Sequence, residues 1–484
     1  MNKLSQHAIA FAVMGLAACA STTGPSETAV AEPIPAYPAV QDEAAFKGLF
    51  KELVEINTTA SEGSCTAAAE AMKARLVAAG LPESDMTIIA KEGWPQDGNL
   101  IVDYPGADAS KKPLLLLAHI DVVEAKPEDW VRDPFKLTED DGIYYGRGVI
   151  DDKAMASIWV DTLIRFKQEG YTPDRPVKMA LTCGEEGVKE RIGLKYLVDE
   201  HFDLIDSEFA LNEGGGGYLD GASGQYVFNG VQAGEKLYQD YKLEITNPGG
   251  HSSRPLPDNA IYRLSAALTE VSKMDFPVEF NDATRNFFTK MADIRGGDFG
   301  AAMKAAAEKQ DEQAIALLKS DPSTNSILHT TCVATMVDAG HAPNALPQRA
   351  TANVNCRIFP GHSPEDIRQD LVKTIGDDGI EVTFADDPET AAPPPALTPE
   401  ILASIEAITE AMYPGVPVVA TMASGATDGR FLIPVGIQTY GVSGIFSDPT
   451  KANAHGLNER VTVKSLMEGR EFLYRLVKAY TEGA

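Results

Sequence analysis

The sequence is poor in cysteine, histidine and tryptophan, with 5 Cys, 8 His and 3 Trp among its 484 residues. The cysteines stand at positions 19, 65, 183, 332 and 356, and no two of them form a C-x-x-C pair. They are too few for a disulfide scaffold. The one pairing that the pattern suggests is Cys332 with Cys356, which would bond if their strands are neighbours.

Positive charge is also scarce. The chain has 42 Lys and Arg against 70 Asp and Glu, which gives a formal net charge of −28. This balance argues against a nucleic-acid partner, because phosphate binding needs clustered Lys and Arg. Hydrophobic residues make up 44% of the chain, which is ordinary for a globular protein, and the length allows two domains.

Long hydrophobic runs are absent beyond the N-terminus. Lys3 and the apolar stretch 8–18 form a pattern typical of a signal peptide, too short to span a bilayer. The stretch ends in "LAAC", which resembles a bacterial lipoprotein box with Cys19 as the lipid-bearing residue. Residues 20–41 are small and Pro-rich, which predicts a flexible tether.

We therefore expect a signal peptide at 1–18 and a lipidated Cys with its tether at 19–41. The protein would be lipid-anchored in the bacterial cell envelope, facing the periplasm or the exterior, and would contact a membrane only through this anchor. An ordinary secretory signal and a soluble secreted protein are the alternative.

Strands alternating with helices predict an α/β sheet from residue 42 to 234. Near residue 237 the order becomes β-α-β-β-α-β, the split βαβ layout, interrupted by an acidic, helix-prone insertion at 279–325. A Pro-rich linker then leads back to the α/β pattern. The sequence therefore predicts a larger domain at 42–234 and 387–484, with a smaller domain at 235–386 inserted into it.

Polar residues collect where the predicted strands end. In chain order they are His119, Asp121, Asp151, Asp152, Glu185, Glu186 and Glu213. One acid at a strand end is usually a helix cap, but in open α/β sheets the carboxyl ends of the strands face the ligand crevice. Clustered carboxylates repel one another without a cation, and His with Asp or Glu suits Zn²⁺ or another divalent first-row ion. The pattern predicts a metal site.

Other catalytic motifs are missing, since the chain has no H-E-x-x-H and no G-x-S-x-G. His455 lies in a loop of the larger domain, where a second imidazole ligand would be needed. His329 is expected inside an alternating strand, with a structural role. The other histidines lie in the signal, in helical or turn contexts, or in the smaller domain: His7, His201, His362, His251 and His341.

Seven motifs resemble one known family when taken in order. They are "HIDVV", "YGRGVIDDK", "GEEG", "NEGG", "GHSS", "NALP…NCRIFPG" and "AHGLNE". The set resembles the M20 metallopeptidase family, closest to its aminoacylase and carboxypeptidase S branch, over about residues 42–484. The resemblance implies an α/β, mixed-sheet zinc-peptidase catalytic domain, with residues 235–386 as an inserted ferredoxin-like lid and dimerisation domain and hence a homodimer.

The resemblance also implies two divalent metal ions, with Zn²⁺ expected and Co²⁺ or Mn²⁺ as alternatives. Asp151 would bridge the two ions. His119 and Glu213 would hold one ion, and Glu186 and His455 the other. A two-metal site lowers the pKa of water and stabilises the developing oxyanion.

Catalytic roles follow from the same resemblance. Glu185 would be the general base that deprotonates the water and then protonates the leaving amine. Asp121 would hydrogen-bond His119 and fix its tautomer. The alternative for the Glu185-Glu186 pair is a solvated turn.

Three residues of the smaller domain match the family. His251 resembles a residue that reaches the partner subunit's site and stabilises the oxyanion; the alternative is a turn histidine. Arg357 resembles the Arg that grips the substrate's free carboxylate with its planar fork; the alternative is a surface Arg at a strand end. Asn344 would lie near the same pocket.

We therefore predict a metal-dependent hydrolase of amide bonds next to a free carboxylate. It would be a carboxypeptidase, a dipeptidase or an N-acyl amino acid hydrolase, with peptides or N-acyl amino acids as substrates. One alternative is a catalytically inactive cell-envelope binding lipoprotein, which predicts a missing ligand or base. Another is a synthase that uses the same site in the condensation direction.

Overall fold

The computed structural model describes residues 42–187 and 191–482. The expected signal peptide, the lipidated Cys19 and the tether lie outside these residues. Within the described ranges, no helix has both the length and the apolar character needed to cross a membrane.

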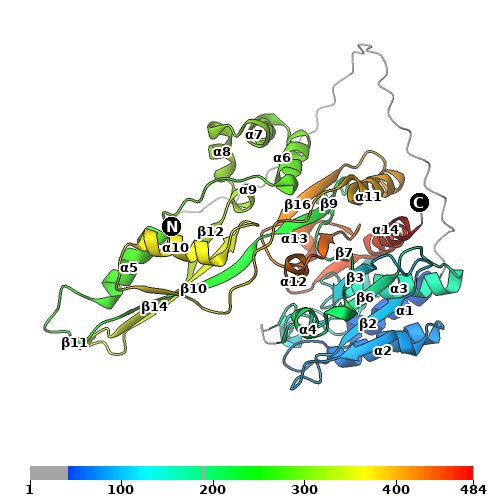
Figure 1. The fold of residues 1–484 in the computed structure, drawn as a ribbon, viewed down its shortest axis with the longest axis horizontal. Coiled ribbons are helices and arrows are strands. Elements are labelled where there is room, and N and C mark those ends of the chain that lie inside the picture. Colours follow the sequence, from blue (N-terminus) through cyan, green and yellow to red (C-terminus); the bar gives the residue numbers. More distant parts are fainter. Residues whose placement is uncertain (1–41, 188–190, 483–484) are drawn as a thin grey trace, which may run out of the picture. The chain divides into compact units, whose positions relative to one another are not determined.

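A ten-stranded mixed sheet organises the larger domain (Figure 1). Its strands are β1 Met86–Ile89, β2 Asn99–Tyr104, β3 Leu114–His119, β6 Val177–Thr182, β7 Phe209–Asn212, β8 Gly216–Leu219, β9 Tyr226–Glu235, β16 Val418–Ala423, β17 Gln438–Gly441 and β18 Phe446–Ser447. Their order is β1-β2-β6-β3-β7-β17-β9-β8-β18, with β16 paired to β9. The central strands β6, β3, β7 and β17 are parallel.

Helices cover both faces of this sheet (Figure 1). They are α1 Glu43–Glu55, α2 Cys65–Ala78, α3 Lys153–Glu169, α4 Gly193–Glu200, α11 Pro399–Met412, α12 Gly429–Leu432, α13 Pro449–Ala452 and α14 Val463–Thr481. α4 and α12 pack on the face that carries Leu115 and Leu117, while α1, α2 and α14 gather around α3. A separate three-stranded sheet contains β4 Thr138–Asp140, β5 Ile143–Tyr145 and β19 Arg460–Thr462.

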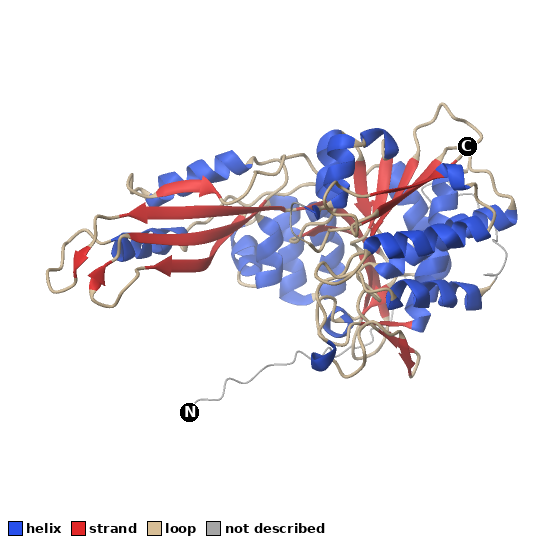
Figure 2. Cartoon of the chain, turned by 90° about the horizontal axis from the view of Figure 1, so that it is seen from below, coloured by secondary structure: helices blue, strands red, loops and turns tan. Residues whose placement is uncertain are grey.

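A four-stranded antiparallel sheet organises the smaller domain (Figures 1 and 2). Its elements are β10 Leu237–Thr246, α5 Ala260–Val271, β12 Thr331–Ala339, β14 Arg349–Ile358, α10 Pro364–Ile375 and β15 Glu381–Phe384. This succession is the predicted split βαβ order, and α5 and α10 share one hydrophobic core with the sheet. A two-stranded antiparallel sheet of β11 Gly250–His251 and β13 Ala345–Leu346 lies beyond the end of β10.

The insertion predicted at 279–325 forms four helices. They are α6 Asp282–Arg295, α7 Gly297–Lys309, α8 Glu312–Lys319 and α9 Pro322–Leu328. These helices have a core of their own around Phe288 and Met303. α6 also packs on β16 of the larger domain, where Ala420 N–H donates to Asn286 Oδ1 at 2.9 Å.

The strand that was expected to contain His329 begins after this residue. Asp321 caps α9 by accepting from the N–H groups of Ser323 and Thr324, and the helix continues to Leu328, so β12 starts only at Thr331. His329 therefore lies between helix and strand rather than inside a strand. It is buried, and its ring nitrogens contact Thr330 O at 2.7 Å and Asn325 Oδ1 at 3.0 Å.

Two disulfides are present in the described residues. Cys332 and Cys356 occupy directly paired positions of the neighbouring strands β12 and β14 and are bonded. Their strands are thus neighbours, as the suggested pairing required. Cys65 and Cys183 form the second bond across 118 residues, which the sequence pattern did not predict.

Candidate metal centre

The parallel strands β6, β3 and β7 bring the predicted ligands to one edge of the sheet. Residues 114–118 of β3 have no exposed surface, and β3 lies between β6 and β7. His119 ends β3, the Glu185-Glu186 pair follows β6, and Glu213 follows β7. Because these strands are packed on both faces, the side chains at their ends have little freedom to move.

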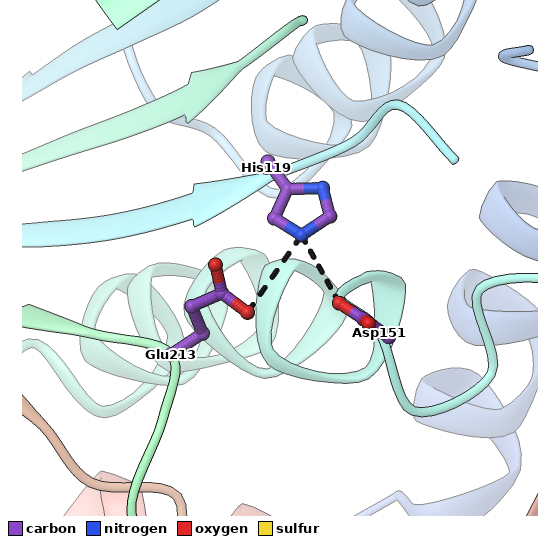
Figure 3. A group of neighbouring side chains, drawn as sticks. All are labelled: His119, Asp151 and Glu213. Carbon is purple, nitrogen blue, oxygen red and sulfur yellow. Dashed lines mark hydrogen bonds and ion pairs between the residues drawn. The ribbon is translucent and has the colours of Figure 1, made fainter. Parts of the chain in front are cut away.

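His119, Asp151 and Glu213 form the first ligand group (Figure 3). His119 Nε2 lies 3.2 Å from Asp151 Oδ1 and 3.8 Å from Glu213 Oε2. Asp151 comes from the turn that precedes α3.

Asp151, Glu186 and His455 form the second ligand group. His455 Nε2 lies 3.0 Å from Asp151 Oδ2 and 2.6 Å from Glu186 Oε1. In each group the ligand atoms lie within 4.8 Å of one another. The two oxygens of Asp151 thus face two different imidazoles, which is the arrangement expected of a carboxylate shared by two ions.

The backbone of Asp121 fixes the orientation of His119. The Nδ1 of His119 donates to the carbonyl of Asp121 at 3.1 Å, so Nε2 carries the lone pair that a metal needs. The hydrogen bond predicted for the Asp121 side chain is thus made by its main chain, while Oδ1 lies 3.6 Å from Nδ1. The carboxylate instead accepts the N–H groups of Glu185 at 3.3 Å and Glu186 at 2.9 Å.

The electrostatics of this cluster favour a bound cation. Burial raises the pKa of Glu185 to about 9, with the charge of His119 opposing and that of Glu213 adding to the effect. Burial lowers the pKa of His119, but the charge of Glu213 and bonds to neighbouring carboxylates raise it well above its usual range. The carboxylates outnumber the imidazoles, and their mixed O and N donor set fits divalent first-row ions.

Arg357 lies at the base of the smaller domain. It is half-buried on β14, and its guanidinium lies 4.5 Å from the centre of the Tyr238 ring. Its Nη1 donates to the carbonyl of Ser424 in the larger domain at 3.4 Å. Its fork is therefore held close to the loop that follows β16.

His251 and Asn344 lie at the far end of the same sheet. Both are exposed at the two-stranded β11–β13 sheet, His251 in β11 and Asn344 directly before β13. His251 Nδ1 lies 2.8 Å from Ser253 Oγ, and the carbonyl of Asn344 accepts from Ser252 N–H at 3.0 Å. This two-stranded sheet lies at the Arg349 end of β14, opposite Arg357. Within one chain, Asn344 therefore neighbours His251 and not Arg357, with which it was expected to share a pocket.

Two features of the site carried no recognised signal in the sequence. The Cys65–Cys183 bond joins the first turn of α2 to the turn that carries Glu185. A buried pair, Arg147 with Glu459, lies behind the second ligand group. Arg147 and Glu459 stand inside two motifs that carry ligands, "YGRGVIDDK" and "AHGLNE". This position places them near the ligands, but it does not indicate that the two residues pair with each other.

Fold and ligand cluster together define a metallohydrolase of the α/β class. Among known proteins, the pattern of Peptidase family M20/M25/M40 matches residues 115–479. The chain belongs to this family, as the ordered motifs predicted.

Two proteins with similar sequences carry names of amide-bond or peptide-bond hydrolases. "N-fatty-acyl-amino acid synthase/hydrolase PM20D1.1" of Danio rerio is 29% identical over 399 residues, which cover 77% of this chain and 73% of that protein. "Probable carboxypeptidase S-like 2" of Dictyostelium discoideum is 27% identical over 395 residues, covering 78% of this chain and 74% of its own.

Solved structures share the fold. The M20 family metallo-carboxypeptidase Sso-CP2 of Sulfolobus solfataricus has a TM-score of 0.67 at 17% identity, covering 90% of this chain and 99% of its own. The YXEP protein of Bacillus subtilis, described as a dinuclear metal binding peptidase, has a TM-score of 0.57 at 12% identity, covering 90% of this chain and 98% of its own. The chain is thus a metal-dependent hydrolase of peptide or amide bonds that uses divalent ions.

Proposed function

We propose that this hydrolase cleaves the amide bond next to a free carboxylate in a peptide or N-acyl amino acid, using two divalent ions, with Zn²⁺ as the expected metal. The observation that carries the proposal is the position of Asp151, whose two oxygens face His119 and His455 at 3.2 and 3.0 Å. Relatives named for N-fatty-acyl-amino acids and for carboxypeptidase S support the substrate class.

Two bound divalent ions would lower the pKa of a water and polarise the scissile carbonyl. Glu185 is the general base: it takes the proton from the attacking water and passes it to the leaving nitrogen. Burial raises its pKa to about 9, and two bound cations nearby would lower this pKa, which favours the ionised form that accepts a proton.

Arg357 binds the free carboxylate of the substrate. Its guanidinium is planar and doubly donating, which matches a carboxylate, and its stacking on Tyr238 restricts the rotation of the fork. Such a contact selects substrates by charge at a fixed distance from the scissile bond.

The smaller domain is the lid and the dimerisation surface. Its edge strand β12 exposes apolar side chains, with Val333 59%, Met336 71% and Val337 66% exposed. An exposed apolar edge strand is a natural pairing surface for a second copy. In such a dimer, His251 of one chain would reach the partner's site and stabilise the oxyanion, with Asn344 beside it.

The protein acts in the cell envelope, held by lipid on Cys19 or, in the alternative, secreted in soluble form. Two disulfides fit an oxidising compartment. An inactive binding lipoprotein on the same scaffold is disfavoured, because each metal ligand and the proposed base are present and close together.

The test is a hydrolysis assay of the zinc-loaded protein. We expect turnover of N-acyl amino acids or dipeptides, and no turnover of the same compounds when their carboxylate is amidated. A chelator should abolish turnover, and added Zn²⁺ should restore it. Equal turnover of free and amidated substrates would contradict the assigned role of Arg357. Turnover that survives complete removal of metal would contradict the mechanism.

The condensation direction is a second candidate, favoured by the "synthase/hydrolase" names of the relatives. The same site would join the amino group of an amino acid to a carboxylic acid, forming an amide and releasing water. A high concentration of free amino acid should then shift the product ratio towards the amide.

A further inference from the structure

A buried ion pair joins the two loops that carry ligands of the second group. Arg147 Nη1 lies 2.7 Å from Glu459 Oε2, and the two side chains are only 3% and 0% exposed. Neither residue belongs to a ligand group. A buried ion pair costs desolvation free energy and contributes little net stability, so its presence needs another explanation.

Glu459 holds the backbone that leads into Asp151. Its Oε2 accepts the N–H of Gly148 at 3.0 Å in addition to Arg147. Its Oε1 accepts the N–H groups of Ile150 at 3.0 Å and Asp151 at 3.2 Å. One carboxylate therefore fixes four donors of the 147–151 loop, including the main chain of the shared ligand itself.

Arg147 reaches in the other direction, to the loop of His455. Its Nη2 donates to the carbonyl of Gly456 at 3.1 Å, next to His455. Its guanidinium lies 5.0 Å from the centre of the Trp130 ring, which restricts its orientation. The pair thus connects two loops that are 312 residues apart in sequence.

The loop of His455 needs such support. Asn453, His455 and Asn458 all have left-handed backbone, with φ of 57°, 60° and 55°. Residues other than glycine adopt this conformation at a cost, and it persists where surrounding contacts impose it. Here the contacts come from Arg147 on Gly456 and from Val131 N–H, which donates to Asn458 Oδ1 at 3.1 Å.

We propose that Arg147 and Glu459 form a positioning clamp that sets Asp151 and His455 at the spacing required for the second divalent ion. The proposal rests on the two-ion site of the proposed function. The clamp holds two ligands of the second ion, Asp151 and His455, but only the shared Asp151 of the first ion. Its loss therefore weakens the second ion more than the first.

Glu459→Gln is the sharpest variant. The side chain keeps its size, but a carboxamide has one oxygen and an NH₂ group in place of two acceptors. The NH₂ group then faces either Arg147 or the N–H groups of Ile150 and Asp151, so one set of donors loses its acceptor.

A second buried pair provides the matched control. Arg470 contacts Asp161 through two bonds of 2.7 and 2.9 Å, with side chains only 1% and 8% exposed, and it joins α14 to α3. Asp161→Asn makes the same chemical change in an equally buried pair outside the two loops. It measures what the loss of a buried ion pair does to stability alone.

Metal affinity is measured on metal-free protein by titration with Zn²⁺ against a chromophoric competing chelator. Wild type should bind two ions. Glu459→Gln should bind the second ion about 10- to 100-fold more weakly, the usual effect of losing a group that orients a ligand, with a clearly smaller loss for the first ion, which shares only Asp151 with the clamp. Asp161→Asn should leave both affinities within twofold of wild type, even if it lowers the thermal unfolding midpoint as much as Glu459→Gln does.

The proposal is overturned if Glu459→Gln binds both ions as tightly as wild type does, or loses affinity for both ions equally. It is also overturned if Asp161→Asn loses as much affinity for the second ion as Glu459→Gln does. If Glu459→Gln does not fold, Arg147→Lys carries the same prediction, because lysine keeps the charge but lacks the second N–H that reaches Gly456. A wild type that binds a single ion would instead contradict the proposed two-ion function, so the two failures are distinguishable.

Discussion

In the proposed mechanism the chemistry depends most on Glu185, and its neighbour Glu186 offers a contrast within one turn. Glu186 lies 2.6 Å from His455 in a ligand group, while the proposed role of Glu185 is proton transfer. Glu185→Gln should therefore retain both ions and lose at least about 100-fold in kcat, the low end for general acid–base catalysis. Glu186→Gln should instead lose the second ion.

These two variants are compared by metal content after dialysis and by turnover at saturating substrate. Near-normal kcat in Glu185→Gln would contradict its role as the base. Loss of metal from Glu185→Gln would show that it acts as a ligand, since His119, Glu185 and Glu186 also form a possible group.

At the level of elements, the Cys65–Cys183 bond connects α2 to the turn after β6. Cys183 is also held by Asn99, whose Oδ1 accepts its N–H at 2.9 Å. In the chain-entropy account a bond that closes a longer loop stabilises more. The loop here spans 118 residues, against 24 for Cys332–Cys356, which corresponds to a difference of about 1.4 kcal/mol.

We expect the double variant Cys65→Ser/Cys183→Ser to lower the free energy of unfolding by about 2–5 kcal/mol and to lower kcat, because one anchor of the Glu185 turn is lost. Cys332→Ser/Cys356→Ser is the control and should lower stability less, with kcat retained. Urea unfolding and initial rates measure the two effects. Equal effects of the two variants on kcat would contradict the positioning role.

Lys236 lies between β9 and β10, where the chain passes from the larger sheet to the smaller one. Its Nζ donates to the carbonyl of Ser326 at 2.8 Å and to Thr331 Oγ1 at 3.2 Å. Burial lowers its pKa from 10.5 to about 7, and the charge of Arg357 adds to the effect. Between these two values the unfolded chain binds one more proton than the folded chain, so this residue makes stability rise with pH.

Lys236→Met should remove that contribution. From pH 7 to pH 9, the free energy of unfolding of wild type should therefore rise relative to the variant, as measured by urea denaturation. Lys242→Met, on the exposed part of β10, is the control. Its free energy of unfolding should change with pH as that of wild type does. If the free energies of unfolding of Lys236→Met and wild type changed in parallel with pH, the lowered pKa of Lys236 would be contradicted.

Sequence patterns predicted the elements that are determined locally. Ser64, a residue type favoured at helix N-caps, caps α2, and the apolar run of β3 is fully buried and ends on His119. The α9–β12 boundary was missed because the capping of Asp321 and Pro322 outweighs strand propensity in the residues that follow. The Cys65–Cys183 bond and the Arg147–Glu459 pair depend on segments that meet only in the folded chain, so no local pattern reveals them.

At the scale of the whole molecule, the proposed dimer predicts complementation between inactive variants. Glu185→Gln lacks the base, and His251→Asn lacks the group offered to the partner. A mixed dimer would contain one site with both Glu185 and the partner's His251, so mixing the two unfolded variants and refolding them together should restore part of the activity.

Sedimentation should show a dimer in each preparation, and refolding each variant alone is the control. A monomeric wild type, or a mixture as inactive as its components, would contradict the role of His251 across the dimer.

The order of the ligands along the chain has a consequence for synthesis. His119, Asp151, Glu186 and Glu213 all precede the smaller domain, whereas His455 and Glu459 come close to the C-terminus. Ribosomes make chains from the N-terminus at about 5–20 residues per second, so the second ligand group lacks its imidazole until synthesis is almost complete. If hydrolysis needs both ions, as proposed, we expect the chain to be inactive until its last residues are made, and a premature stop before His455 to yield an inert fragment.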